Sequence, residues 1–192
     1  DSHKAGQSVE VDWSGKTMQL VDPVTGVVSR VYLFVAALPF SRFAFVEPTL
    51  DMKQDTWLRA HVAMFDWFGG SVPRIVPDNL KTGVIKHPAE GEVVLNDAYR
   101  ELAAHYSAAV LPGRVRKPKD KASVENTVAH VATWVIAGLR DRRFATLAEL
   151  RAYEDEVLYP LAMRRVEIDL DDGVAVNYPK FGRALARVKG LS

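Results

Sequence analysis

The run Val-Tyr-Leu-Phe-Val-Ala-Ala-Leu at positions 31–38 is apolar without alternation, and its residue types favour a β-strand. A strand with one face in water would carry polar residues at every second position. The run therefore indicates a strand that is covered on both faces and lies near the centre of a sheet. This strand is expected to begin at Val27, just after Gly26, and to end at Leu38, before Pro39.

Shorter β-rich segments flank this strand on both sides. On the N-terminal side, Ser8–Trp13 and Thr17–Val21 are predicted as two strands joined by a turn at residues 14–16. On the C-terminal side, Phe43–Glu47 is predicted to complete an antiparallel meander, which Pro48 ends.

The hydrophobic pattern then changes to a helical period of threes and fours. It predicts a helix over Asp55–Phe68, ended by Gly69-Gly70, and a short buried strand over Pro73–Asp78. The irregular segment Lys81–Val94 is predicted to be a mobile loop with a β excursion. The elements expected after it are a helix from an Asn96 or Asp97 cap to Tyr106, a strand at Ala108–Leu111, a long helix over Lys119–Leu139, and a helix over Thr146–Arg164 with a Thr146/Glu149 capping box. This order describes an α/β protein with a mixed sheet flanked by helices.

The composition is that of an ordinary globular domain. The chain has 192 residues, of which 48% are hydrophobic, enough for one core, and its formal net charge is only +1. Because there is no cysteine, disulfides, thiolate metal sites and cysteine nucleophiles are excluded. The longest apolar run is far shorter than a membrane span. Since the chain begins with Asp and shows no signal peptide, we expect a fragment of a longer intracellular protein.

Three acidic residues stand in settings that differ from ordinary surface positions. Asp12 lies within the largely apolar strand at residues 9–13, where a carboxylate is costly unless it has a partner or a cation. Asp78 follows residues 74–77 at the carboxyl end of a buried strand, where α/β sheets bind their ligands. Glu125 lies in the first turns of the long predicted helix.

These acids would meet at one edge of the sheet if the strands bearing Asp12 and Asp78 are neighbours and the helix bearing Glu125 crosses them. Clustered carboxylates oppose one another's ionisation, and a divalent ion such as Mg²⁺ removes the conflict. Glu10 shares a strand face with Asp12 and is a rival ligand.

The acids lie in the blocks VEVDWSG (9–15), VPDNLKT (76–82) and RKPKDKASVEN (116–126). In this order the blocks resemble the catalytic core of DDE transposases and retroviral-type integrases, and most of all the IstA transposase of the IS21 insertion-sequence family. The resemblance covers about residues 5–145. It implies an RNase H-like fold with a five-stranded mixed sheet, two Mg²⁺ or Mn²⁺ ions, hydrolysis at transposon 3′ ends and strand transfer into target DNA. By position, Asp12, Asp78 and Glu125 would be the catalytic, metal-binding acids.

The resemblance also implies a domain organisation and partners. Residues 1–145 would form the catalytic core, residues 146–168 an additional helix packed on or extending it, and residues 169–192 an exit linker toward a C-terminal domain absent from this chain. The expected partners are transposon-end DNA, target DNA, an AAA+ ATPase helper of the IstB type and further copies of the chain. The expected location is the bacterial cytoplasm, in association with DNA and without a membrane.

Several residues near the acids are candidates for DNA contact. A basic run precedes Glu125, and its cations could hold phosphates there, although a solvated helix start is the simpler interpretation when the acids are ignored. Asn79 and Lys81 follow Asp78 closely enough to touch substrate or the groups around the acids; a capping Asn or an exposed Lys is an equally good interpretation. The interval from Asp78 to Glu125 is 47 positions (125 − 78), longer than in retroviral integrases, so Lys81–Leu95 is expected to be an insertion. The cations of the run are Arg114, Arg116, Lys117, Lys119 and Lys121.

Other motifs favour structural roles. Residues 15–17 (GKT) lack the earlier glycine of a P-loop and lie in a strand region, which argues against an ATP site. The histidines show no metal-ligand spacing, and the tryptophans at 57, 67 and 134 fall on helical apolar stripes, so both sets are expected mainly at the surface or in packing. The histidines are His3, His61, His87, His105 and His130.

Two alternative functions stay open. One is an RNase H-like nuclease or resolvase that cuts DNA without joining it. The other is a catalytically silent integrase-like module used for dimerisation.

Overall fold

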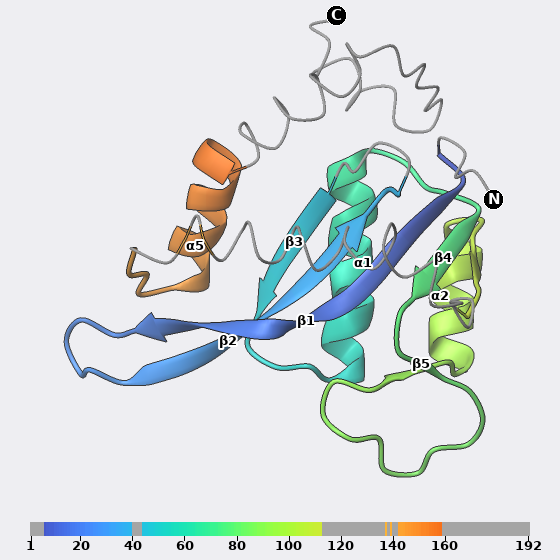
Figure 1. The fold of residues 1–192 in the computed structure, drawn as a ribbon, viewed down its shortest axis with the longest axis horizontal. Coiled ribbons are helices and arrows are strands. Elements are labelled where there is room, and N and C mark those ends of the chain that lie inside the picture. Colours follow the sequence, from blue (N-terminus) through green and yellow to red (C-terminus); the bar gives the residue numbers. More distant parts are fainter. Residues whose placement is uncertain (1–5, 40–43, 113–136, 138, 140–141, 159–192) are drawn as a thin grey trace, which may run out of the picture.

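A computed structural model describes residues 6–39, 44–112, 137, 139 and 142–158 of the chain. Within these ranges, the main sheet has five strands in the order β3-β2-β1-β4-β7 (Figure 1). Strands β1, β2 and β3 pair antiparallel, whereas β4 lies parallel to β1 and β7 parallel to β4. The strands are β1 (Ser8–Val21), β2 (Val28–Ala37), β3 (Ala44–Thr49), β4 (Arg74–Pro77) and β7 (Ala109–Val110).

This strand order, with three antiparallel and two parallel strands, is the arrangement of an RNase H-like fold, as the sequence predicted. Strand β2 contains the run at 31–38 and lies between β1 and β3. One of its faces contributes Phe34 and Ala36 to a core cluster, and the other contributes Leu33 and Val35 to a second cluster. Both faces are covered, which explains why the run does not alternate.

Strand β1 differs from the prediction. Residues 14–16 form no turn, and the strand continues to Val21 while its pairing with β2 shifts register between Trp13 and Thr17. Thr17–Val21 therefore continues the first strand instead of returning along it. The Ser-Gly-Lys sequence is used for a β-bulge, and the chain reverses only after Val21, where the Asp22 carboxylate accepts the amide of Val24 at 2.8 Å. The hairpin of β1 and β2 extends beyond the rest of the sheet (Figure 1).

Strand β3 also runs past its expected end. Pro48 lies inside it, level with Leu33 of β2. Proline lacks an amide proton, but β3 is the edge strand of the sheet, so no pairing partner is lost on its outer side.

Two helices cover the face of the sheet that bears Phe34. Helix α1 (Gln54–Phe68) ends at Gly69, which has a left-handed φ of 73°. Helix α2 (Asp97–His105) begins at Asn96, whose side chain accepts the Tyr99 amide at 3.0 Å. Both stop and start signals were predicted from the sequence. The core cluster beneath the helices includes Val9, Val11, Trp13, Trp57, Met64, Phe68 and Tyr99.

The opposite face packs against the C-terminal part of the described chain. Leu139, Phe144 and Leu150 join Val35 in the second cluster. Helix α5 (Leu147–Tyr153) begins at Thr146, which accepts the Glu149 amide, and continues as a π-helical turn, η1 (Glu154–Leu158). The remainder of the helix predicted to Arg164 lies outside the described residues.

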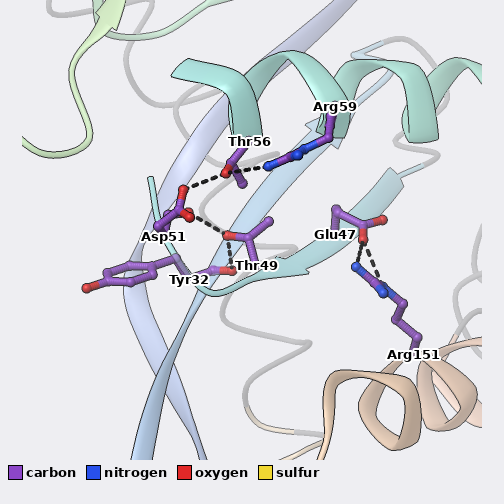
Figure 2. A network of polar contacts seen from close by, with 7 residues as sticks. All are labelled: Tyr32, Glu47, Thr49, Asp51, Thr56, Arg59 and Arg151. Atoms are coloured by element: carbon purple, nitrogen blue, oxygen red, sulfur yellow. Dashed lines mark hydrogen bonds and ion pairs between the residues drawn. The ribbon is translucent and has the colours of Figure 1, made fainter. Parts of the chain in front are cut away.

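An ion pair also joins α5 to the edge strand. Figure 2 shows Arg151 of α5 pairing with Glu47 of β3, at 2.6 Å from Nη2 to Oε1. In the same view, the Asp51 carboxylate accepts the Thr56 hydroxyl at the start of α1. These contacts fix both helices relative to β3.

Two short strands, β5 (Leu80–Lys81) and β6 (Val93–Val94), form a separate parallel pair directly after β4. They confirm the predicted β excursion and enclose a loop of residues 82–92. Among the helices of the described ranges, none is long and apolar enough to cross a membrane.

Candidate active site

The first predicted acid, Asp12, lies on β1 in the middle of the sheet. Alternate residues Val9, Val11 and Trp13 point into the core under α1 and α2. Asp12 is level with Val35 of β2, which belongs to the cluster on the opposite face. The carboxylate of Asp12 is therefore on the face that also contacts Leu139 and α5, where it is partly buried.

The second predicted acid, Asp78, is brought next to Asp12 by the backbone. Strands β1 and β4 run parallel with Val11 level with Pro77, and the Asp78 amide donates to the Val11 carbonyl at 3.2 Å. The residues that follow, Asp12 and Asp78, are thus neighbours across the two strands. Asp78 is exposed, so the pair stands at the surface where a substrate can reach it.

The electrostatics of Asp12 reflect this juxtaposition. Burial, and to a smaller extent the nearby Asp78 carboxylate, raises the pKa of Asp12 from 3.8 to about 7, although a hydrogen bond from the Trp13 amide opposes both effects. A carboxyl group with a pKa this far from its ordinary value, beside a second carboxylate at the end of a neighbouring strand, is typical of a functional site. The two groups supply hard oxygen donors of the kind that Mg²⁺ and Mn²⁺ prefer, and a divalent cation would relieve their repulsion.

The third predicted acid, Glu125, lies outside the described residues, and so do the predicted DNA contacts Arg114, Arg116, Lys117, Lys119 and Lys121. Within the described ranges, no three His, Cys, Asp or Glu side chains are grouped to hold a metal. One end of the helix predicted over Lys119–Leu139 is nevertheless described. Leu139 is buried in the cluster on the face that carries Asp12.

The remaining sequence candidates lie close by. Asn79 and Lys81 follow Asp78 into β5, and both are exposed. Glu10 is 9% exposed and precedes Asp12 by two positions on the same face of β1. It therefore lies near the Asp12–Asp78 pair but deeper in the sheet than the exposed Asp78. Lys16 and its neighbours lie at the bulge of β1, not in a strand-to-helix turn, which confirms that they form no P-loop.

Two buried polar groups lie outside the candidate site, and the burial of the second was not predicted from the sequence. His61 of α1 lies 2.8 Å from both the Trp57 carbonyl and the Tyr99 hydroxyl, so it is a packing residue, as was expected of most histidines. Glu154 of η1 is 2% exposed, and burial, aided by Glu47, raises its pKa well above the ordinary value. Its position four residues after Leu150 was the available signal, because that spacing puts both side chains on one helix face.

The RNase H-like sheet thus carries one carboxylate on β1 and a second directly after β4. No family model matches the chain.

The sequence relatives that match most of the chain include transposases. The chain is 39% identical over 184 residues to an inferred transposase of Sinorhizobium fredii, covering 96% of this chain and 34% of the relative. It is 38% identical to the inferred transposase for insertion sequence IS1162 of Pseudomonas fluorescens, covering 84% of this chain and 29% of the relative. A third inferred transposase, from Mycobacterium tuberculosis, is 41% identical, covering 77% of this chain and 35% of the relative. The chain is thus a homologue of transposases that spans about a third of their length.

Solved structures of similar shape include integrase catalytic cores. The catalytic core domain of BIV integrase aligns with a TM-score of 0.46 and 10% identity, covering 78% of this chain and 82% of that one. The HTLV-2 integrase catalytic core domain in complex with magnesium, in its dimeric form, aligns with a TM-score of 0.45 and 14% identity, covering 72% of this chain and 75% of that one. Because these scores are below 0.5, the fold assignment rests on the order and directions of the strands.

Proposed function

We propose that this chain is the catalytic core of an IS21-like DDE transposase, which hydrolyses DNA at transposon 3′ ends and joins those ends to target DNA. Asp12, Asp78 and Glu125 are the proposed ligands of Mg²⁺ or Mn²⁺. The observation that carries the proposal is the adjacency of Asp12 and Asp78 across β1 and β4, which the shared Val11–Asp78 hydrogen bond fixes. The transposase relatives support the same class of reaction.

The described residues have distinct roles in this proposal. When bound, divalent ions would supply an activated nucleophile and stabilise the leaving oxygen of the phosphodiester. Asp12, held on a strand paired on both sides, provides a carboxylate whose position is set by the backbone. Asp78, exposed beside it, faces the solvent side from which DNA approaches. Trp13 packs on Trp57 with ring centroids 5.5 Å apart and thereby holds this part of β1 against α1.

The third acid can reach the same place if the predicted helix forms. Leu139 packs on the cluster that contains Leu20 of β1. Glu125 would lie 14 residues (139 − 125) before Leu139, about 21 Å along a helix. Asp12 lies eight residues (20 − 12) before Leu20, at most about 26 Å along the strand. The two spans are comparable, so a helix running alongside β1 would bring Glu125 to the level of Asp12.

The wider organisation is proposed on the same basis. Residues 1–145 would form the core, residues 146–168 an additional helix and residues 169–192 a linker to a C-terminal domain. Transposon-end DNA, target DNA, further copies of the chain and an AAA+ helper of the IstB type would be the partners in the bacterial cytoplasm. The relatives are about three times as long as this chain, which leaves room in them for such additional domains.

The first test is metal binding by the chain itself. Titration with Mn²⁺ should raise the unfolding temperature of the wild-type protein, because an ion that binds only the folded state stabilises it. Asp12→Asn should abolish this increase. In EDTA the variant should be at least as stable as the wild type, because an amide removes the repulsion between the carboxylates. Asp66→Asn, on the exposed side of α1, is the matched control and should keep the full effect.

The second test is the reaction. Asp78→Asn and Glu125→Gln in the full-length transposase should abolish joining of a 3′-hydroxyl end to target DNA. Cutting without any joined product by the wild type would identify the chain as a nuclease instead. Mn²⁺ binding that Asp12→Asn leaves unchanged would refute the proposed site and favour the silent module.

A further inference from the structure

The loop at residues 82–92, here called the β5–β6 loop, starts next to the candidate site. Lys81, the residue before the loop, is three positions after Asp78. The ends of the loop are joined by the β5–β6 pairing and by a hydrogen bond from the Leu95 amide to the Lys81 carbonyl at 3.0 Å. Figure 1 shows the loop extending away from the sheet and helices. Its base is therefore fixed beside Asp78 while its body points outward.

The two halves of this loop differ in how they contact the protein. In the second half, a Cβ at Gly91 would lie 3.3 Å from Met52 Sδ, so the backbone is closely packed there. The Glu92 carboxylate accepts the Ala89 amide at 2.8 Å and closes a turn. In the first half, a Cβ at Gly83 would meet nothing within 4 Å, and the Val84 side chain is 93% exposed. The loop thus has an anchored base and an open arm.

The chemistry of the open arm matches a nucleic acid strand. Lys81 at the base of the loop and Lys86 within it lie on either side of Val84 in the sequence, whereas the acidic residues Glu90 and Glu92 lie in the anchored half. Phosphates attract the lysines, and an apolar side chain can pack against base faces or between base steps. An exposed apolar side chain with a cation on either side in the sequence suits a surface that alternates charge and apolar rings.

We propose that the β5–β6 loop contacts the DNA strand beside the phosphodiester held at Asp12 and Asp78, with Val84 against the bases and Lys81 and Lys86 on the flanking phosphates. The inference rests on the proposed function and adds a DNA-positioning element to it. Val84 is six residues from Asp78, a reach of at most about 20 Å. Because successive nucleotides are about 3.4 Å apart along a strand, the contact must fall within about six nucleotides of the reacting bond.

The absence of cysteine from the chain permits a direct test, because a single introduced thiol can be labelled uniquely. Val84→Cys would carry a photo-activated cross-linker, and Val24→Cys, at the 91% exposed tip of the β1–β2 hairpin, is the matched control. The probe is a branched DNA that mimics the joined product. Cross-links from position 84 are expected within about six nucleotides of the branch. Absence of such cross-links, a pattern equal to that of position 24, or cross-linking to a second copy of the chain in place of DNA would overturn the proposal.

A second measurement addresses the lysines. The slope of the logarithm of DNA affinity against the logarithm of salt concentration should fall in magnitude by about two in the Lys81→Gln, Lys86→Gln double variant. The matched control is the double variant Lys16→Gln, Arg30→Gln in the β1–β2 hairpin, which should leave this slope unchanged.

The increase in unfolding temperature with Mn²⁺ separates a failure of the loop proposal from a failure of the proposed function. If the loop variants bind DNA like the wild type while Asp12-dependent Mn²⁺ binding persists, the loop proposal fails and the proposed function stands. If Mn²⁺ binding does not depend on Asp12, the proposed function itself fails.

Discussion

Acidification is expected to destabilise the protein through one buried side chain, His61. Its ring is fully buried, with Nδ1 beside the Trp57 carbonyl and Nε2 beside the Tyr99 hydroxyl. A carbonyl can only accept a hydrogen bond, so Nδ1 carries the proton and Nε2 accepts from Tyr99. Protonation of Nε2 would bury a charge and remove the acceptor to which the Tyr99 hydroxyl donates. Burial accordingly lowers the pKa of His61 from 6.5 to about 4.

The sign and size of the effect follow from these two pKa values. The unfolded chain binds a proton near pH 6.5, whereas the folded chain binds it only near pH 4. The stability contributed by neutral His61 is therefore fully present above the unfolded pKa and is lost as the pH falls toward the folded pKa. The difference between the two pKa values corresponds to at most about 3 kcal/mol in the free energy of unfolding, and about 2 kcal/mol of this is lost by about pH 5.

Urea unfolding followed by circular dichroism, at a series of pH values from neutral to about pH 5, measures this loss. The reference is the double variant His61→Leu, Tyr99→Phe, which replaces both polar partners by apolar groups and should be nearly neutral at neutral pH. Carboxylates elsewhere titrate in both proteins, so their contributions cancel in the comparison. The wild type should lose about 2 kcal/mol more than the reference. Parallel curves for the two proteins would refute the burial of a neutral His61.

Three further predictions concern the contacts that hold the framework of the site. Arg151→Ala leaves Glu47 without its cation and should lower the free energy of unfolding by about 1 kcal/mol in urea titrations. Arg100→Ala breaks an exposed pair with Asp97 and should change it by less than about 0.5 kcal/mol. Equal effects of the two variants would contradict a contribution of the Arg151–Glu47 pair to the packing of α5 on β3. Gly91→Ala and Gly26→Ala, at φ values of +80° and +71°, should each lower the free energy of unfolding by at least about 1 kcal/mol. The loss should be larger at position 91, where the new Cβ meets Met52, than at position 26, where it meets nothing within 4 Å. A smaller loss at position 91 would show that the loop base is not packed. Asn96→Ala should cost about 1 kcal/mol by thermal unfolding because the Tyr99 amide loses its acceptor, while the exposed Asn79→Ala should cost almost nothing.

Patterns that depend on local periodicity were read correctly from the sequence. The apolar run of β2 and the threes-and-fours pattern of α1 are dictated by burial on known faces, so both elements were predicted within a few residues. From the sequence, Asp12 and Asp78 were expected to meet only if their strands were neighbours, and the structure pairs β1 with β4. The roles of these residues and of Glu125 stay predictions.

Features that depend on tertiary contacts were not predicted correctly. Ser14-Gly15-Lys16 has a composition that suits both a turn and a bulge, and only pairing with β2 decides between them. The His61–Tyr99 hydrogen bond joins residues 38 positions apart, a separation with no periodic signature. Glu154 breaks the rule that acids avoid the interior, and its burial arises from the packing of η1 near β3.

The bulge after Trp13 also has a consequence for protein engineering. It interrupts the register of β1 between Asp12 and the hairpin tip, so we expect length changes nearer the tip to leave the pairing around Asp12 unchanged. The exposed reversal at residues 22–27 is therefore a suitable place to insert an affinity peptide or a fluorescent reporter. A chain tagged there would keep its two carboxylates in register, and it would give a label on this core that leaves both chain ends untouched.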